Sequence, residues 1–338
     1  MSCCPESNCC EDIGFQTAST TLTTNDTIGA IKMRLGIGRM SYAIPPGLYA
    51  IGNPTGDSDV LVSANYKLTF DTLRKNLDGL DIWILILDTN GINVWCAAGK
   101  GTFGTNELIN RIQVANLSQY VTHKNLIVAQ LGAVGISAHE VTKATGYNVI
   151  YGPVRASDIK AFIAADYTKT KEQSQATFGL WDRFVLTPMA LIPVLKIAVP
   201  IIMALATVAH IGIKPFRKFD MYAFLLSIFS GAVLMPILLP FIPFKSFSAK
   251  GALVGFSTTF DLLFWSKKLE NRNWRLILGH LLLFPAISSF VATQFTGSST
   301  YTSPSGVQKE IKKSMPFIAI AGAIGLILTL WFNARRDD

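Results

Sequence analysis

The sequence predicts an α/β domain built on a parallel sheet, followed by an all-α domain of five transmembrane helices. Three observations predict this fold class. Half of the 338 residues are hydrophobic and only 15% are charged, whereas about a quarter of the residues in ordinary soluble domains are charged. Strand-like and helix-like segments alternate between residues 45 and 170. Long apolar stretches then follow residue 183.

The alternating part contains short β-rich runs and segments with helical spacing of apolar residues. The run at 81–87, DIWILIL, is almost continuously apolar, as expected for a strand that is buried on both faces. Strands that alternate with helices indicate a parallel sheet with helices on both faces, and such sheets bind ligands beyond the carboxyl ends of their strands. We expect strands at 47–51, 60–64, 81–87, 125–131 and 148–151, and helices at 69–77, 105–117, 137–145 and 156–167.

The apolar part predicts a membrane domain, because a bilayer core requires about 20 helical residues per span. Residues 1–40 contain no apolar core of the kind found in export signals. We therefore expect a multi-pass protein of the inner (cytoplasmic) membrane whose α/β domain faces the cytoplasm. The expected spans are 184–213, 220–243, 250–266, 273–295 and 315–333. The expected organisation is a lead-in at 1–44, an α/β domain at 45–170, a linker at 171–183 and a transmembrane domain at 184–338.

The net charge of +8 does not indicate a nucleic-acid partner. Residues 1–182 carry 14 basic and 16 acidic side chains, and residues 183–338 carry 16 basic and 6 acidic ones. The basic excess therefore lies between apolar runs, as in membrane loops, and not in a groove that follows phosphates. Two other motifs are weak. Residues 99–104 spell GxGxxG without the spacing of a dinucleotide site, and neither His123 nor His139 has a partner at metal-ligand spacing.

Four cysteines form two vicinal pairs near the N-terminus, in the segment MSCCPESNCC. Adjacent cysteines do not easily share one tetrahedral ion, so an iron–sulfur cluster or a structural zinc site is not predicted. Four thiols this close together favour capture of a soft thiophilic metal. The alternative is an incidental polar tail. The candidate metal-capturing residues are Cys3, Cys4, Cys9 and Cys10.

The fifth cysteine, Cys96, follows a predicted strand at the edge where the fold binds ligands. Asn93 is a good N-cap, so a helix beginning at Val94 places Cys96 in its first turn, where the helix dipole favours a thiolate. The small residues that follow Cys96, at 97–99, let a flat ligand approach the backbone closely. These features predict a thiolate that faces a large planar cofactor. The alternative is a buried structural cysteine.

Residues 93–100, NVWCAAGK, closely resemble the cap-helix motif of the corrinoid protein of bacterial mercury methylation. The surrounding residues 45–170 resemble the Rossmann-like corrinoid-binding domain of the corrinoid iron–sulfur proteins. The matching blocks are VLVSANYKLTFDTLR at 60–74, QLGAVGISAHEVTKATG at 130–146 and YGPVRASDI at 151–159. The cysteine cluster and the barrel domain of the carbon-fixing relatives are absent from the sequence.

The resemblance implies a bound cobalamin, a cobalt corrinoid, with the Cys96 thiolate as the lower axial ligand of cobalt. It implies that Asn93 and Trp95 position the cap helix and that Gly99 and Lys100 complete its turn against the corrin. The remaining cap-helix residues implied to contact the cofactor are Val94, Ala97 and Ala98. The residues implied to line the corrin and its tail are Asn65, Thr69, Gly132, Ser137, Gly152, Pro153 and Arg155.

The implied activity is that of a corrinoid-dependent methyltransferase. It transfers a methyl group from methyl-Co(III) cobalamin to the substrate Hg(II) and gives methylmercury. The implied partners are a ferredoxin-like [4Fe–4S] electron donor and a methyl donor protein or methyltetrahydrofolate-dependent methyltransferase. The main alternative is a membrane-tethered methyl carrier of one-carbon, acetyl-CoA pathway metabolism. A corrinoid sensor or transporter is a further alternative, which a thiolate ligand does not favour.

Overall fold

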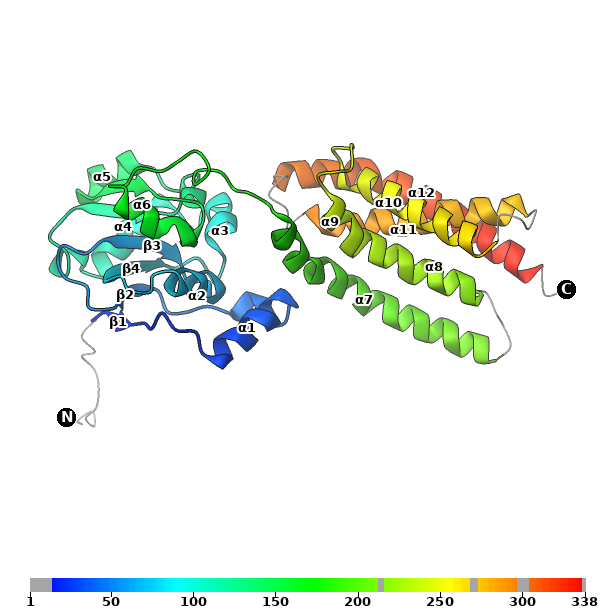
Figure 1. The fold of residues 1–338 in the computed structure, drawn as a ribbon, viewed down its shortest axis with the longest axis horizontal. Helices are drawn as coiled ribbons and strands as arrows, with labels where there is room; N and C mark the ends of the chain where they lie inside the picture. The colour runs from blue at the N-terminus through cyan, green and yellow to red at the C-terminus, as the bar shows by residue number, and fades with distance from the viewer. Residues whose placement is uncertain (1–13, 212–215, 268–272, 297–303, 336–338) are drawn as a thin grey trace, which may run out of the picture. The chain divides into compact units, whose positions relative to one another are not determined.

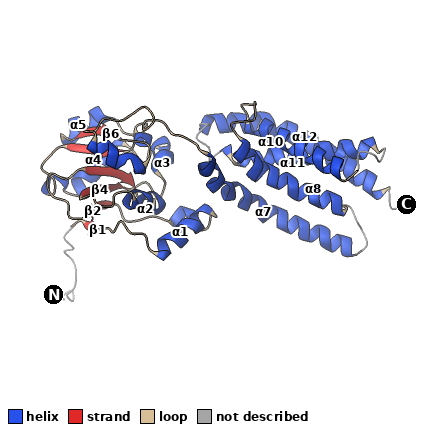
Figure 2. Cartoon of the chain, in the orientation of Figure 1, coloured by secondary structure: helices blue, strands red, loops and turns tan. Residues whose placement is uncertain are grey.

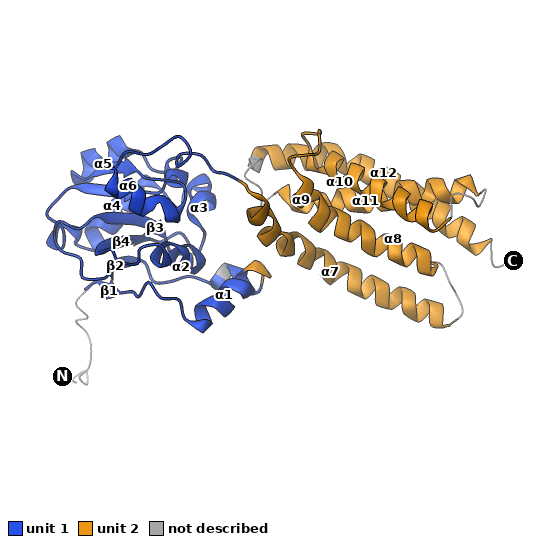
Figure 3. Ribbon diagram, in the orientation of Figure 1, with its two compact units in different colours: residues 1–33, 37–177 blue, residues 34–36, 178–338 orange. Residues whose placement is uncertain are grey.

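The computed structural model describes residues 14–211, 216–267, 273–296 and 304–335. The chain divides into two compact units, which Figure 3 colours separately. We call residues 1–33 and 37–177 the α/β unit, and residues 34–36 and 178–338 the helical unit. Each unit is described by itself.

The α/β unit is built on one sheet of six strands in the order β1-β2-β4-β3-β5-β6 (Figures 1 and 2). The pairs β4–β3, β3–β5 and β5–β6 are parallel, which confirms the predicted parallel core of the sheet. The strands are β1 at Gln16–Thr17, β2 at Gly47–Ile51, β3 at Val60–Ala64, β4 at Ile82–Leu87, β5 at Asn125–Val128 and β6 at Asn148–Tyr151.

The expectation of an all-parallel sheet was wrong for β2, which runs antiparallel to β4. The reason lies in the connection between β2 and β3, residues 52–59. A right-handed crossover between parallel strands needs a dozen or more residues, usually with a helix, and this connection has neither. The alternation of strands and helices that predicts a parallel sheet therefore begins only at β3. Antiparallel strands at one side of such sheets are common.

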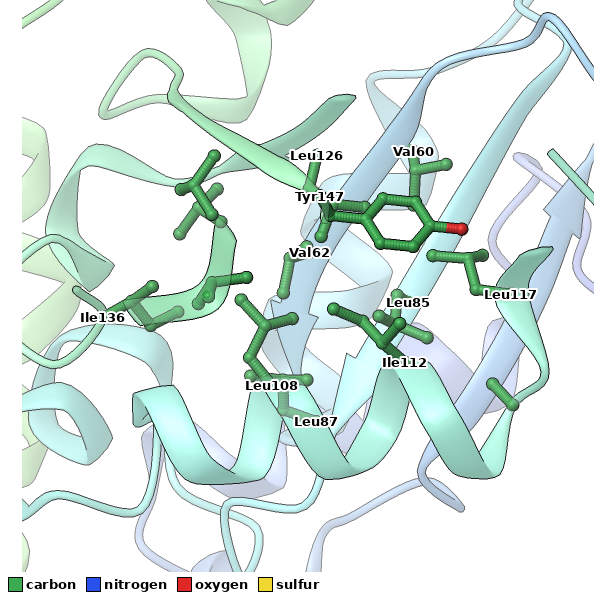
Figure 4. Close-up of a cluster of buried hydrophobic side chains, with 14 of the residues drawn as sticks. Val60, Val62, Leu85, Leu87, Leu108, Ile112, Leu117, Leu126, Ile136 and Tyr147 are labelled. Carbon is green, nitrogen blue, oxygen red and sulfur yellow. The ribbon is translucent and has the colours of Figure 1, made fainter. Parts of the chain in front are cut away.

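Helices cover both faces of the sheet. One hydrophobic core joins α4 and α5 to the side chains of Val62, Leu85 and their neighbours on one face (Figure 4). A second core joins α2 and α6 to Leu61, Ile84 and Ile86 on the other face. Successive strand residues alternate between the two cores, as the pleat requires. These helices are α2 at Lys67–Lys75, α4 at Thr105–Val114, α5 at Ala138–Thr145 and α6 at Ile159–Ala164.

The lead-in before β2 contains a helix that the sequence did not reveal, α1 at Thr24–Arg34. Its carboxylate Asp26 accepts hydrogen bonds from Lys67 Nζ at 2.5 Å and from Arg74 Nη2 at 2.8 Å. Both bases also pair with Asp71 on α2, at 2.7 and 2.8 Å. This charged network fixes α1 to α2, which forms one wall of the candidate site described below.

The helical unit contains a helix in each of the five expected stretches. They are α7 at Leu180–His210, α8 at Lys218–Phe229, α10 at Phe247–Trp265, α11 at Trp274–Gln294 and α12 at Pro304–Ala334. A π-helical turn, η5 at Ser230–Leu234, continues α8 into the short α9 at Met235–Leu238. Prolines at 188, 193 and 200 lie inside α7 without ending it.

Four of these helical stretches are long and apolar enough to cross a membrane: 180–210, 218–238, 274–294 and 305–334. The expectation of five spans was therefore wrong for α10 within the described residues. Polar and charged residues lower its mean hydropathy, and several of them face other helices: Ser248, Lys250 and Thr259 are buried. The polar and charged residues of α10 are Ser248, Lys250, Ser257, Thr258, Thr259 and Asp261.

Small residues let the helices of this unit approach closely. A Cβ on Gly251 or Gly255 would lie 2.4 Å from an atom of α11, and a Cβ on Gly325 would lie 2.5 Å from the backbone of Leu283. Ser288 Oγ and Ser289 Oγ donate hydrogen bonds across to carbonyls of α10, each at 2.8 Å. Close packing of small residues and interhelical hydrogen bonds are the usual basis of helix association in membranes.

The network at Asp26 predicts an acid-dependent loss of stability. Burial alone would raise the pKa of Asp26, but hydrogen bonds from Lys67, Thr23 and Arg74 outweigh it and hold this pKa far below its ordinary value of 3.8. A carboxyl with a lowered folded-state pKa stabilises the fold above its unfolded pKa and loses that contribution as the pH falls below it. We expect the melting temperature of full-length protein to fall below about pH 4.

The Asp26→Asn variant is the control for this pH dependence. It should melt below the parent protein above pH 5, and the difference should shrink as the pH falls towards 3, because Asp26 of the unfolded parent then takes up a proton and part of the parent's advantage is lost. Calorimetry at pH 3 to 7 measures this. A constant difference across the range would show that the ion pairs are not responsible.

Candidate functional site

The carboxyl ends of β3 and β5 mark the point at which the sheet topology reverses. From β3 the chain proceeds to β4 on one side, and from β4 it crosses over β3 to β5 on the other side. In open α/β sheets the crevice at such a switch point is where ligands bind. The structure therefore places the candidate site where the sequence predicted it.

A cavity of about 380 Å³ lies at this switch point. Its floor is formed by residues of β3 and β5, and its walls come from α2, the first residues of the cap helix and the turn after β6. The volume is in the range of small-molecule pockets. The predicted site residues that line it are Thr69, Asn93, Val94, Trp95, Gly152 and Pro153.

The cap helix is α3, at Val94–Lys100, and begins where the sequence predicted. The side chain of Asn93 accepts a hydrogen bond from the backbone N of Cys96 at 2.9 Å, so Asn93 is the N-cap. Ala97 and Ala98 are buried against the core below. Cys96 is a free, partly exposed thiol in the first turn. It follows directly after Trp95 and is not itself among the residues that line the cavity.

Asn65 acts on the cap helix through the loop that precedes it. Its buried amide donates to Asp88 Oδ1 at 3.0 Å and accepts from the backbone N of Thr89 at 3.1 Å and of Gly91 at 2.9 Å. These bonds join the end of β3 to the loop after β4. Asn65 does not line the cavity, so the structure assigns it a positioning role.

The C-terminal end of the cap helix faces away from the protein core. Gly99 and Lys100 are exposed, and a Cβ on Gly99 would meet no atom within 4 Å. The turn itself is made by Gly101, whose φ of 82° is in the left-handed region that favours glycine. Glycine within a helix costs about 0.5–1 kcal/mol relative to alanine. Packing inside the chain therefore gives no reason for glycine at 99, whereas a ligand close to the backbone would.

The remaining predicted site residues lie around the cavity without lining it. Gly132 packs against the ring of Phe103, which a Cβ would approach to 2.4 Å. Ser137 is the residue before α5. Arg155 is exposed, and its guanidinium donates to Thr177 Oγ1 at 2.7 Å. Gly132 thus has a packing role, the backbone N of Ser137 donates to Thr105 Oγ1 at 2.9 Å, and Arg155 lies between Val154 and Ala156, which line the cavity.

Sequence reasoning missed most of the apolar lining of the cavity. The missed residues lie inside or shortly after the predicted strands at 60–64, 125–131 and 148–151, or on α2, so the signal that could have found them was their closeness to the carboxyl ends of these strands. Lys169 also lies nearby: it pairs with Gln130 and donates to the Tyr151 carbonyl at 2.8 Å, and burial lowers its pKa. The missed lining residues include Ser63, Tyr66, Leu68, Thr72, Ala129, Leu131, Val154 and Ala156.

The four N-terminal cysteines, Cys3, Cys4, Cys9 and Cys10, lie outside the described residues. Within the described ranges, no group of three or more His, Cys, Asp or Glu side chains could hold a metal ion. His139 is exposed on α5, and His123 Nε2 lies 2.9 Å from the Ser58 carbonyl. The thiol that the described part of the α/β unit offers to a metal is that of Cys96.

Comparison with known proteins gives matches to subunits named for acetyl-CoA synthesis. A protein-family model described as the CO dehydrogenase/acetyl-CoA synthase delta subunit matches residues 37–163. The acetyl-CoA decarbonylase/synthase complex subunit gamma of Methanopyrus kandleri is 31% identical over 127 residues, which are 37% of this chain and 27% of that protein. The same subunit of Archaeoglobus fulgidus is 29% identical over 131 residues, 38% of this chain and 27% of that protein.

The subunit of Methanocaldococcus jannaschii is 28% identical over 143 residues, 40% of this chain and 29% of that protein. The chain thus spans between a quarter and a third of the length of these relatives. The family match lies within the α/β unit. These comparisons support the coarser resemblance seen in the sequence, to proteins of acetyl-CoA synthesis. They do not support the finer one, to mercury methylation.

The contacts of Asn65 predict that the Asn65→Ala variant loosens the cap helix. It removes four hydrogen bonds, one of them donated by Thr89 Oγ1 at 2.8 Å, and leaves the backbone amides of Thr89 and Gly91 buried without partners, which costs about 3 kcal/mol of unfolding free energy. Hydrogen exchange of residues 88–100 in the full-length protein should rise. Asn76→Ala is the matched control, since it removes one bond at the exposed end of α2. Equal effects of the two variants would contradict the positioning role.

Proposed function

We propose that the α/β unit binds a corrinoid and that the protein is a membrane-tethered corrinoid-dependent methyltransferase. The observation that carries this proposal is the free thiol of Cys96 in the first turn of a capped helix, whose first residues line a cavity at the switch point of the sheet. The relatives named as subunits of acetyl-CoA decarbonylase/synthase complexes support the proposal independently.

The residues present fit a corrinoid. The cavity can hold a nucleotide-sized tail beside Thr69, Gly152 and Pro153, and it is too small for a whole corrin ring. The unfilled space beside Gly99 leaves the outer side of the cap helix open to a flat group. A thiolate is a suitable ligand for a transition metal such as cobalt. Cys96 would supply that ligand, and the Asn93 cap would fix the backbone that carries it.

When bound, a corrinoid supplies a cobalt centre that accepts and releases methyl groups. Cys96 would provide an anionic sulfur ligand to that metal. A thiolate pushes electron density onto its metal, as it does in haem proteins with a cysteine ligand. The Cys96 sulfur would thereby favour release of a methyl group with carbanion character. A methyl group with carbanion character is transferred readily to a soft electrophile.

Hg(II) is the acceptor that we propose on this ground. The support is the thiol itself together with the residues around it, NVWCAAGK at 93–100. The four N-terminal cysteines would bring the soft metal to the protein.

The second candidate is a methyl carrier of one-carbon metabolism, and the comparisons favour it more directly than they favour mercury. The relatives named above are subunits of complexes that make or cleave acetyl-CoA, by their names, and no comparison concerns mercury. In this alternative the same cofactor and the same Cys96 serve a different acceptor, held by a partner protein.

Both candidates require partners. Since the described residues include no metal-binding cluster for electron transfer, we propose a ferredoxin-like [4Fe–4S] protein as the electron donor. The methyl group would come from a methyl donor protein or a methyltetrahydrofolate-dependent methyltransferase. We propose further that the apolar helices of the helical unit anchor the protein in the cytoplasmic membrane, with the α/β unit on the cytoplasmic side.

The Cys96→Ala variant tests the proposed function. Full-length protein loaded with cobalamin and supplied with reductant, methyl donor and Hg(II) should form methylmercury, measured by mass spectrometry. The variant should form at least a hundredfold less, because the axial sulfur is gone, and should keep cobalamin within a few fold, because the cavity is intact. Absorption spectra report the change of cobalt ligand.

Two outcomes would contradict parts of this proposal. Equal methylmercury formation by the parent and Cys96→Ala would overturn the thiolate mechanism. A parent protein that binds cobalamin through Cys96 but passes no methyl group to Hg(II) would decide in favour of the one-carbon carrier.

The N-terminal cysteines give a separate prediction. Replacing Cys3, Cys4, Cys9 and Cys10 with serine should lower the number of Hg(II) ions bound per protein, because four of the five thiols are removed. Cobalamin binding should stay the same, since Cys96 remains. Titration with Hg(II), followed by dialysis and elemental analysis, measures the capture. Unchanged stoichiometry would remove any role for this segment in mercury delivery.

A further inference from the structure

The helical unit contains a large open cavity that the proposed methyl transfer does not use. It lies between α10, α11 and the first half of α12, and its volume is about 1030 Å³. Its lining changes character along its length. Lysine, serine and glutamate side chains lie at one end, and Leu281, Pro285, Phe317 and other apolar side chains line the rest. Phe317 is 71% exposed, so its ring lies uncovered at the rim.

The packing of the helices explains why the cavity opens where it does. Helices α11 and α12 cross closely at Gly279 and Gly325, where an added Cβ would lie within about 3.0 Å of the facing helix. Nearer the start of α12 the helices diverge, and the cavity occupies the space between them. Glu310 is held at this end because it accepts a hydrogen bond from the backbone N of Ser248, at 2.8 Å, in the first turn of α10. That bond joins α12 to the start of α10 at this end of the cavity.

Three lysines give this end a positive charge. Lys309 and Lys313 are one helical turn apart on α12, and Lys245 lies just before α10. All three are exposed, and none has a carboxylate partner among the described residues. The carboxylate of Glu310, the acid that also lines the cavity, already bonds the α10 backbone. The end of the cavity therefore presents ammonium groups to an anion.

The length of the cavity matches one leaflet of a membrane. From Lys309 to Ala321, α12 rises about 18 Å at 1.5 Å per residue. Half of a bilayer hydrocarbon core is about 15 Å thick. The lysines lie at helix ends, where lipid headgroups lie, and the apolar lining extends towards the middle of the helices. The start of α7 lies near this end of the helical unit too. Arg183 Nη1, in the first turn of α7, donates to the carbonyl of Ile237 at 2.7 Å, and Ile237 lies in α9, shortly before α10.

We infer that this cavity binds one molecule of an anionic phospholipid. The phosphate lies among Lys245, Lys309 and Lys313, and an acyl chain lies along Leu281, Pro285 and Phe317 as far as Ala321. Basic pockets between membrane helices are a recurring way to hold anionic lipid headgroups. A free phosphate would use the lysines alone, and a zwitterionic lipid would gain less from them. The apolar groove favours a ligand with an acyl chain, and the three lysines favour a headgroup with a net negative charge.

The test compares two lipids in the full-length protein. Protein is reconstituted in nanodiscs that contain equal amounts of phosphatidylglycerol and phosphatidylcholine, then extracted into mild detergent. Native mass spectrometry counts the lipids retained. The parent should retain phosphatidylglycerol in preference to phosphatidylcholine. The variant with Lys245→Gln, Lys309→Gln and Lys313→Gln should bind it about a hundredfold more weakly, at about fivefold per lysine.

Two further variants separate a built site from general attraction to charge. Lys312→Gln removes a lysine on the same helix that does not line the cavity, and it should retain as much phosphatidylglycerol as the parent. Ala321→Phe fills the deep end of the cavity and should weaken retention of phosphatidylglycerol while leaving the lysines in place. Millimolar inorganic phosphate should not displace the lipid.

Two sets of results would contradict the inference that the cavity binds an anionic phospholipid. Equal retention of both lipids by the parent, or equal loss in Lys312→Gln and the triple variant, would overturn the inference in favour of nonspecific surface charge. Unchanged retention in Ala321→Phe, or displacement by inorganic phosphate, would show an anion site without an acyl-chain groove. None of these measurements requires cofactor, so their outcome is independent of the proposed methyl transfer.

Discussion

The hydrogen bonds of one buried amide, that of Asn65, determine where the cap helix begins. They join the end of β3 to the loop that leaves β4, two neighbouring parallel strands. The loop then reaches Asn93, whose own side chain caps the helix that carries Cys96. Two asparagines thus give the backbone of Cys96 a rigid path from the sheet. The cavity beside the cap helix depends on the same path, since Asn93 and Trp95 form part of its wall.

Much of this arrangement could be predicted from the sequence, because it rests on local signals. The apolar run at 82–87 can only be a buried strand, and Asn93 before Val94 is a strong start signal for a helix. The carboxyl edge of the sheet follows from these two features. What could not be predicted depends on partners far apart in the chain. The direction of β2 and the role of Asn65, whose bonds span more than twenty residues, are of this kind.

In the helical unit, too, features that rest on local signals could be predicted, and features that rest on contacts between distant residues could not. Hydropathy located a helix in each of five stretches of the described residues, because long apolar runs have few other structures open to them. It did not distinguish α10, whose buried polar residues contact α11 and α9: Ser248 and Gly251 carbonyls accept from serines, and Lys250 donates to the Leu239 carbonyl. Nor did it reveal Asp220, buried 2.8 Å from His280 Nε2 and bonded by Asn333. In a hydropathy profile such residues only lower the mean hydropathy of a helix, whereas the structure shows that they make contacts between helices.

The shortness of the cap helix has a thermodynamic consequence. A helix of seven residues is too short to be stable by itself, and this one also contains a glycine that no contact inside the chain requires. Its order is therefore maintained by the caps at its two ends, by the packing of Val94, Ala97 and Ala98 on the core and by whatever covers its outer side. Any group that binds there selectively in the folded state adds its binding free energy to this segment by mass action. Occupancy would thus set the lifetime of the segment against proteases, and empty protein would be cleared from the cell before loaded protein.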